Sequence, residues 1–363
     1  MENVIYHQVE AENVKTSYKE YDQIDYIIGF EGTATITDAD DCSMDCKIGA
    51  HSVISSCVTQ FQSKGVIENI TDYPRLVKTK TECDKIENDM LNSNYTCELR
   101  SPHQTISNLM IRPVVPVTYG GTAGGKMEQA VLGLQDSLPS FSIKPRICLN
   151  NASGNTRLSD EQSGAVKLTF TLERNMGVLH GRNLIAGNTY QYELSNLRVC
   201  YMSSPPQKPQ EVSMRCSVGL KSSINSAFSN TSSKVPAVCD SVSVSFLRQD
   251  HEYNGNFVNT ALEEPPHISK INYLFNDATN QYVSFEIKDR ADMLKRGLDS
   301  VIGGSSNSAQ LQKLSSNKGF ILGLNWGAMV NLANQKFNIQ LQTDIDNLEP
   351  YIMYMFFHSV FKI

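Results

Sequence analysis

The strongest constraint on the fold is a recurrent alternation of apolar and polar side chains with a period of two. Residues 166–173, VKLTFTLE, are apolar at every second position, and the segments 241–248, 283–287 and 337–341 repeat this pattern. Successive side chains of a strand point to opposite faces, so the period is typical of strands with one buried face. The chain is therefore predicted to be all-β, and we expect these faces to form one continuous core.

Two strand-like segments depart from simple alternation. Between residues 190 and 202 the apolar phase shifts near Asn196, which predicts a β-bulge of one residue. The segment 351–357, YIMYMFF, is apolar on both phases, which predicts a strand that is covered on both faces and paired on both edges. Alternate residues should enter the barrel (Ile352, Tyr354, Phe356) or face a second layer or a neighbouring subunit (Met353, Met355, Phe357).

Helices are predicted to be few and peripheral. Residues 288–302 carry an apolar stripe that stops at Gly303-Gly304, a helix C-cap signal, and residues 126–138 are a second candidate. Ser-, Asn-, Gly- and Pro-rich stretches predict long connections at 203–210, 229–236, 254–267 and 303–317. No internal repeat is visible, and no βα rhythm occurs, which favours a sandwich or a jelly roll.

Charge and targeting signals exclude several classes of protein. Among the 363 residues, 32 basic against 38 acidic side chains give a net charge of −6, and no run of Lys and Arg exceeds two residues. Duplex binding normally needs a clustered basic face, so genome binding is not expected. The N-terminus lacks the apolar stretch of a signal peptide, and the longest apolar run, 351–357, is too short to span a bilayer. We expect a cytoplasm-like compartment.

The nine cysteines are odd in number and include no CxxC pair, which predicts reduced thiols that pack as small apolar groups. Cys42 and Cys46 could begin a zinc site, but no second ligand pair follows at a familiar spacing.

One glycine-rich stretch must be tested as a nucleotide site. Gly120 to Met127, GGTAGGKM, fits the G-x-x-x-x-G-K part of a phosphate-binding loop. That loop needs Ser or Thr after the lysine to hold Mg²⁺, and here the residue is Met127. Pro113 and Pro116 upstream are incompatible with a central parallel strand. We therefore predict a glycine turn that binds no nucleotide.

The seven histidines do not form a catalytic motif such as HExxH. Asp250-His251-Glu252 could contribute metal ligands only with a third element, and His358, in an aromatic strand, is predicted to be a buried structural histidine. Sequons begin at Asn69, Asn94, Asn151 and Asn230, and they carry little weight without an export signal. We predict no catalytic, cofactor-binding or metal-binding residue.

Several segments, taken in order, resemble a known family. They are 49–58 (GAHSVISSCV), 65–73 (GVIENITDY), 141–150, 164–174, 192–201, 337–344 and 350–354. Their order and spacing are similar to those of vertical jelly-roll capsid proteins of double-stranded DNA viruses. The resemblance is closest to the penton proteins of virophages and polinton-like viruses.

The resemblance implies an all-β fold with a single vertical jelly-roll barrel, long inter-strand insertions and few short helices. The expected boundaries are an N-terminal arm at 1–22, a capsid domain at 23–363, and an upper β domain inserted at about 84–236. A double jelly-roll major capsid protein is expected to need a longer chain.

The implied function is structural: a homopentamer at the five-fold vertices of an icosahedral virion, assembled in the host cytoplasm. Its partners would be other copies of itself, the major capsid protein, and minor or cement proteins of the shell. The resemblance implies no enzymatic activity, no cofactor, no sequence-specific nucleic acid and no membrane insertion. The alternatives are a β-sandwich attachment, fibre or minor capsid protein that binds a surface ligand, and an enzyme built on the glycine loop.

Overall fold

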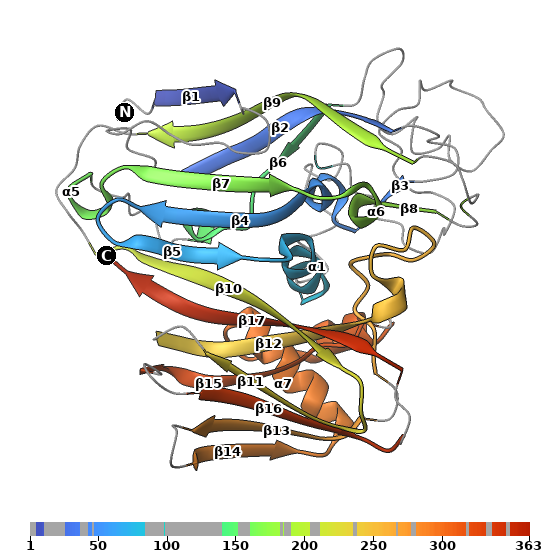
Figure 1. Ribbon diagram of the computed structural model, residues 1–363. Coiled ribbons are helices and arrows are strands. Elements are labelled where there is room, and N and C mark those ends of the chain that lie inside the picture. Colours follow the sequence, from blue (N-terminus) through green and yellow to red (C-terminus); the bar gives the residue numbers. More distant parts are fainter. Residues whose placement is uncertain are drawn as a thin grey trace.

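The computed structural model describes a chain composed mainly of strands (Figure 1). The described residues are 5–10, 26–36, 43–45, 47–83, 98, 140–151, 160–181, 184, 190–203, 211–234, 238–265, 268–276, 281–316, 319–331, 336–345 and 349–363. The all-β class predicted from the alternation is confirmed. We refer to residues 5–203 as the first half and residues 211–363 as the second half.

The second half forms a barrel of eight strands in two four-stranded arrays. One array has the order β15-β12-β17-β10 and the other the order β11-β16-β13-β14. The strands are β10 (Ser213–Ile224), β11 (Phe228–Lys234), β12 (Val238–Arg248), β13 (Ile268–Asn276), β14 (Gln281–Ile287), β15 (Leu322–Asn331), β16 (Lys336–Thr343) and β17 (Tyr351–Lys362). The pairings are antiparallel throughout, and the two facing arrays are those of a jelly roll.

The first half repeats this strand order. Its arrays are β1-β9-β2-β6 and β7-β4-β5. The strands are β1 (Ile5–Glu10), β2 (Tyr26–Ile36), β4 (Ile54–Phe61), β5 (Gly65–Ile70), β6 (Ser140–Ile143), β7 (Val166–Leu172) and β9 (Tyr192–Ser203), with β3 (Ser43–Met44) and β8 (Leu179–His180) as a separate pair. In chain order β9 corresponds to β17, β2 to β12 and β6 to β15. The sequence analysis, which found no repeat and expected one barrel, missed this duplication.

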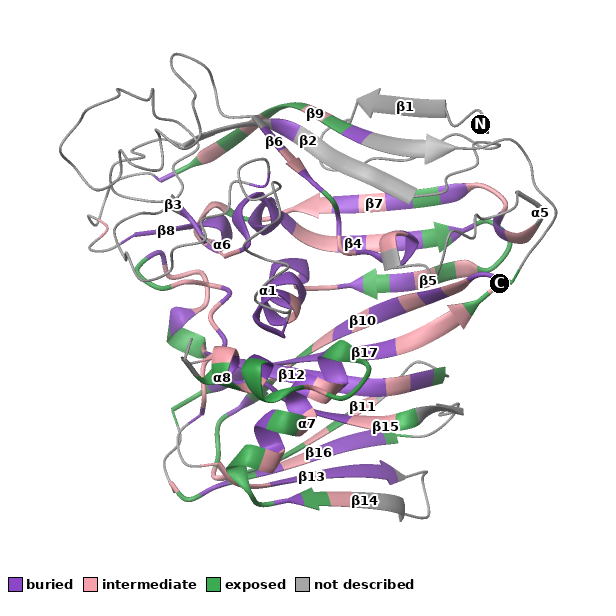
Figure 2. Ribbon diagram, turned by 180° about the vertical axis from the view of Figure 1, so that it is seen from behind, coloured by how far each residue is buried: buried purple, intermediate pink, exposed green. Residues whose placement is uncertain are grey.

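The helices also follow the repeat. Helix α1 (Tyr73–Cys83) follows β5 as α7 (Arg290–Ile302) follows β14, and α8 (Ser308–Ser316) comes after α7. Short helical turns complete the chain: α5 (Asp160–Ser163), α6 (Asn175–Val178), η1 (Gly49–Val53), η2 (Cys148–Asn151) and η3 (Gln249–His251). Helix α1 lies where the two halves meet and packs against α7 and α8 (Figure 2).

The two barrels are joined edge to edge. Strands β5 and β10 run parallel and share one register pair, Asn69 with Val218, which makes a continuous sheet of order β15-β12-β17-β10-β5-β4-β7. Gly219 passes so close to the end of β5 that a Cβ there would lie 2.6 Å from the carbonyl oxygen of Thr71. The strands therefore approach each other more closely than any larger residue at 219 would allow.

The buried apolar side chains form two clusters rather than the single core that was expected. One fills the first barrel and the other fills the second. Strand β17 contributes to both: Ile352, Tyr354 and Phe356 to the first, and Met353, Met355 and Phe357 to the second. It pairs with β10 on one edge and β12 on the other, which confirms the predicted pairing on both edges and the burial of both faces. The predicted assignment of the faces is reversed, because Met353, Met355 and Phe357 fill the strand's own barrel and Ile352, Tyr354 and Phe356 lie against the first half.

Local predictions hold where the pattern is strongest. In β7 the apolar phase of the alternation (Val166, Leu168, Phe170) is buried. Asn196 has φ +52°, and the pairing of β2 with β9 shifts register beside it, which confirms the bulge. Asp289 caps the start of α7 and Gly303, with φ +73°, ends it. The candidate helix 126–138 lies outside the described residues.

Two expected connections are regular structure, since β11 occupies most of 229–236 and α8 lies within 303–317. Of the expected arm at 1–22, residues 5–10 form β1, which pairs with β9. The insertion at 84–236 stays a prediction. Within that range β7 pairs with β4, and β10 with β17, so these two strands belong to the main sheet.

Candidate functional site

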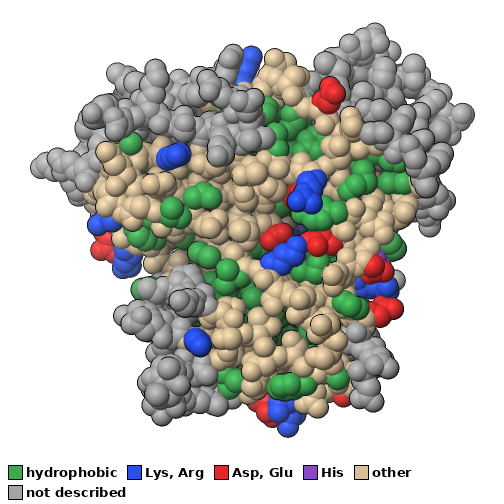
Figure 3. All heavy atoms as spheres, viewed as in Figure 1, with side chains coloured by type: hydrophobic (Ala, Val, Ile, Leu, Met, Phe, Trp, Pro, Cys, Tyr) green, Lys and Arg blue, Asp and Glu red, His purple; other side chains and the backbone are tan. Residues whose placement is uncertain are grey.

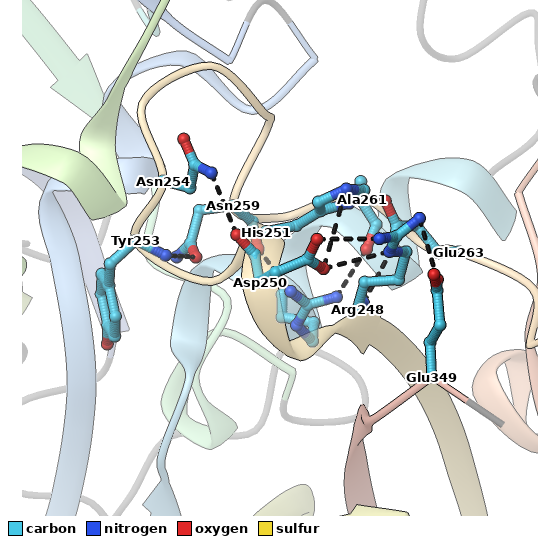
Figure 4. Close-up of polar contacts among 10 residues, drawn as sticks. Arg248, Asp250, His251, Tyr253, Asn254, Asn259, Ala261, Glu263 and Glu349 are labelled. Carbon is cyan, nitrogen blue, oxygen red and sulfur yellow. Dashed lines mark hydrogen bonds and ion pairs between the residues drawn. The ribbon is translucent and has the colours of Figure 1, made fainter. Parts of the chain in front are cut away.

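The side chains of the metal candidate from the sequence, Asp250-His251-Glu252, bind different partners, and Figure 4 shows those of Asp250 and His251. Asp250 receives two hydrogen bonds from the guanidinium of Arg248, at 2.8 and 3.0 Å. The Nδ1 atom of His251 lies 2.6 Å from the Glu263 carboxylate, and its ring stacks on Phe257. Glu252 turns away to Lys221 and Tyr354. Among the described residues, no group of three or more His, Cys, Asp or Glu side chains is placed to hold a metal ion.

The same loop instead fastens the second half to α1. The guanidinium of Arg75, on α1, donates to the carbonyl oxygens of Asn259 and Ala261 and lies 3.9 Å above the ring of Tyr354. Tyr253 has φ +54° and its N–H is held by the Asn259 side chain (Figure 4). This loop therefore has a structural role, since its polar groups bind one another and α1.

A second link across the halves joins Thr260 of the second half to a buried ion pair of the first half, Lys78 of α1 with Asp45. The Lys78 ammonium lies 2.9 Å from the Asp45 carboxylate, which also accepts from the Thr260 hydroxyl. Burial alone would raise the pKa of Asp45, but Lys78 and Thr260 hold it well below its usual range. A buried charge is tolerated only when paired and hydrogen-bonded, and here the partners come from both halves.

Glu68 is the central polar group of the join between the barrels. It is 1% exposed. One carboxylate oxygen accepts from the N–H of Ser217 on β10 at 3.0 Å, and the other accepts from the N–H of Cys148 at 2.7 Å. Burial raises the pKa of Glu68, while these N–H donors and Lys80 oppose the shift. The Glu68 carboxylate thus accepts from a backbone N–H of β10 next to the one register pair that β5 and β10 share.

His358 continues this polar chain into the second half. Its Nδ1 lies 3.1 Å from the Ser217 hydroxyl and its Nε2 lies 3.0 Å from the Ser243 hydroxyl. Burial, together with the positive charges of Arg215 and Lys80, holds the pKa of His358 well below its ordinary value. The ring is therefore neutral, and it is buried and hydrogen-bonded as the sequence predicted.

Comparison with known proteins gives the fold. No family model and no curated protein matches the chain. Among solved structures, the chain is similar to VP54 of PBCV-1 as fitted into a reconstruction of the virophage Sputnik, with a TM-score of 0.55, 10% identity, and coverage of 100% of this chain and 95% of that chain. It is also similar to the Faustovirus major capsid protein, with a TM-score of 0.56, 8% identity, and coverage of 100% and 90%. The chain has the fold of viral jelly-roll capsid proteins.

This capsid fold corrects the argument from length. The sequence analysis expected a major capsid protein to need a longer chain, yet the match covers nine-tenths of the Faustovirus protein. Two barrels fit into the 363 residues, and strands β10 and β17 of the second barrel contribute side chains to both apolar clusters.

The surface of the capsid fold carries mixed charge. On the face drawn in Figure 3, basic and acidic side chains of the described residues lie beside one another without a broad basic patch. The expectation that the chain does not bind duplex stays a prediction. None of the described helices is long and apolar enough to cross a membrane.

The remaining sequence candidates fall into two groups. The glycine loop Gly120–Met127 and the cysteines 42 and 46 lie outside the described residues, as does Asn94. Asn69 and Asn230 are exposed on strands β5 and β11, and Asn151 ends η2. The prediction that the chain has no catalytic, cofactor or metal site stays a prediction.

Sequence reasoning did not identify Glu68 as the polar centre of the join. A signal was present, because Glu68 shares the buried phase of β5 with Ile70. A charged residue on the inward phase of a strand indicates a buried partner.

Proposed function

We propose that this chain is a non-enzymatic structural subunit of an icosahedral virus shell, of the kind that fills the facets. The observation that carries the proposal is the pair of jelly-roll barrels joined edge to edge, in a chain that matches viral capsid proteins over its whole length. The likeness extends to both barrels and to their connection. An attachment module or an enzyme would need only one barrel, together with an open binding or catalytic site. The proposal rests instead on the two barrels and their connection.

The duplication supports a particular mode of assembly. The outer face of β17 and β12 in the second barrel carries Ile352, Tyr354, Phe356 and Leu247, and the first half covers them all. Among the described residues, no second barrel lies against the equivalent array of the first barrel, β1-β9-β2-β6, and its β9 exposes Glu193, Ser195 and Arg198. A neighbouring copy packed there would repeat the contact that the chain makes within itself.

The number of copies separates two positions in the shell. Three two-barrel chains in a closed ring present six barrels, which suits a facet surrounded by six neighbours. The sequence resemblance instead favours a homopentamer at the five-fold vertex, contacting the major capsid protein. Two unlike barrels per chain would give ten barrels around that axis, so we favour the facet position.

Native mass spectrometry of the purified chain, with electron microscopy of negatively stained particles, tests the proposal. We expect a discrete trimer. A discrete pentamer would support the vertex position and overturn the facet position. A chain that stays monomeric across the whole concentration range, with no ring in the images, would overturn the shell role itself.

A further inference from the structure

Three buried thiols surround the Glu68 carboxylate at the join. Cys57 lies on β4, Cys148 on η2 and Cys216 on β10, and each is 0% exposed. All three belong to the apolar cluster of the first barrel, although Cys216 is carried by the first strand of the second half. The thiols therefore meet at the place where the two barrels are connected.

Glu68 fixes the backbones that carry two of these thiols. Its two carboxylate oxygens bind the N–H of Cys148 and the N–H of Ser217, the residue after Cys216. Because both oxygens belong to one carboxylate, the two backbone segments are close neighbours, and η2 packs directly on β10. The thiols of Cys148 and Cys216 interact with each other, and that of Cys148 also contacts Glu68.

Glu68 also affects the acidity of the pair. Burial raises the pKa of the Cys148 thiol well above its ordinary value, and the charge of Glu68 raises it further, so the thiol is inert while it is buried. Cys239 and Cys83, which are buried in the second cluster, lie apart from this carboxylate.

We propose that Cys148 and Cys216 are a dithiol pair that closes to a disulfide and so links the two barrels covalently. The oxidant is a small-molecule disulfide. Cys148 gives its proton to solvent water, and its thiolate attacks one sulfur of the oxidant, forming a mixed disulfide and releasing a small thiolate that takes up a proton from water. Cys216 gives its proton to water in the same way, and its thiolate attacks the Cys148 sulfur, which releases the second small thiolate to be protonated. Two protein thiols are oxidised and one disulfide is reduced to two thiols.

The pair would be open in a reducing cytoplasm and closed outside the cell, because disulfides persist only in oxidising surroundings. Both sulfurs are fully buried, so the reaction takes place while the join forms or when it opens. The inference concerns the chain itself and holds for any number of copies in an assembly.

The test incubates the purified full-length chain with oxidised glutathione, alkylates the remaining thiols, and maps non-reduced peptides by mass spectrometry. We expect one new cross-linked peptide, joining residues 148 and 216, a mass lower by two hydrogen atoms, and a higher melting temperature that dithiothreitol reverses. A wild-type chain that stays fully alkylated, or that joins Cys57 to either partner, would overturn the assignment.

Matched variants isolate the pair. Cys216→Ala should form no cross-link, whereas Cys239→Ala, which removes an equally buried thiol in the second cluster, should still form it. A cross-link that persists in Cys216→Ala, or that is lost in Cys239→Ala, would overturn the pairing.

Discussion

The close approach of β10 to β5 can be tested by adding one methyl group at Gly219. A Cβ there would lie 2.6 Å from both the carbonyl oxygen and the Oγ1 of Thr71, and 3.1 Å from its backbone nitrogen. Real contacts of this type do not occur below 3.0 Å, and two of the three atoms belong to the backbone. The strands must therefore separate. Overpacking of this kind costs about 1–3 kcal/mol, so we expect Gly219→Ala to lower the free energy of unfolding by that amount.

The control is Gly304→Ala, because a Cβ at Gly304 would meet nothing within 4 Å. Neither glycine lies in the left-handed region, so both substitutions reduce the entropy of the unfolded chain alike. The difference between their changes in unfolding free energy therefore measures the steric cost of the added Cβ at position 219. Urea denaturation followed by tryptophan fluorescence and by circular dichroism measures both. A stability change within about 0.5 kcal/mol is expected for the control. If the two variants are equally stable, β10 does not pack on Thr71 as described.

Three further predictions address the cores and the pH dependence. Phe170→Ala should cost about 3–5 kcal/mol in urea denaturation, since the ring is 2% exposed, whereas Thr169→Ala on the other face should cost under about 1 kcal/mol; equal costs would contradict the assigned faces. His358 has a lowered pKa in the folded chain, so the unfolded chain binds more protons and the free energy of unfolding should fall as the pH drops below about 6.5. The His358→Gln variant should show a flatter dependence of stability on pH. If the wild-type dependence survives the substitution, His358 is not its cause. Deleting residues 350–363 should leave an insoluble or molten chain, because β17 fills both clusters, and a soluble, cooperatively folding product would refute this assignment.

The fold class could be predicted because its signals are local. The alternation in β7, the shifted phase at Asn196 and the cap at Gly303 each depend on neighbouring residues alone. The two apolar phases of β17 even indicated a second layer beyond the barrel. These features follow from the geometry of strands and helix ends, which any local sequence must satisfy.

The duplication could not be predicted, because the two barrels share an order of strands and not a pattern of residues. The helices α1 and α7 illustrate the difference. Helix α7 has an apolar stripe and clear caps, whereas α1 buries Arg75, Lys78 and Glu82 because it lies between the halves. Charged residues are usually exposed, so their burial on α1 is not expected from the sequence. Ser217 and Thr260, the second-half partners of Glu68 and Asp45, are distant from them in sequence and become their neighbours only through the join.

The two-sided strand β17 bears on the order in which the chain acquires structure during synthesis. It is synthesised after every other described strand, and β10 and β12 cannot form their pairings with it until then. Until it arrives, the nascent chain holds two unfinished interiors, and the contacts that close them span long sequence separations. Translation must therefore pass this strand before both interiors can close, and until then an incomplete chain exposes apolar surface that the finished chain buries.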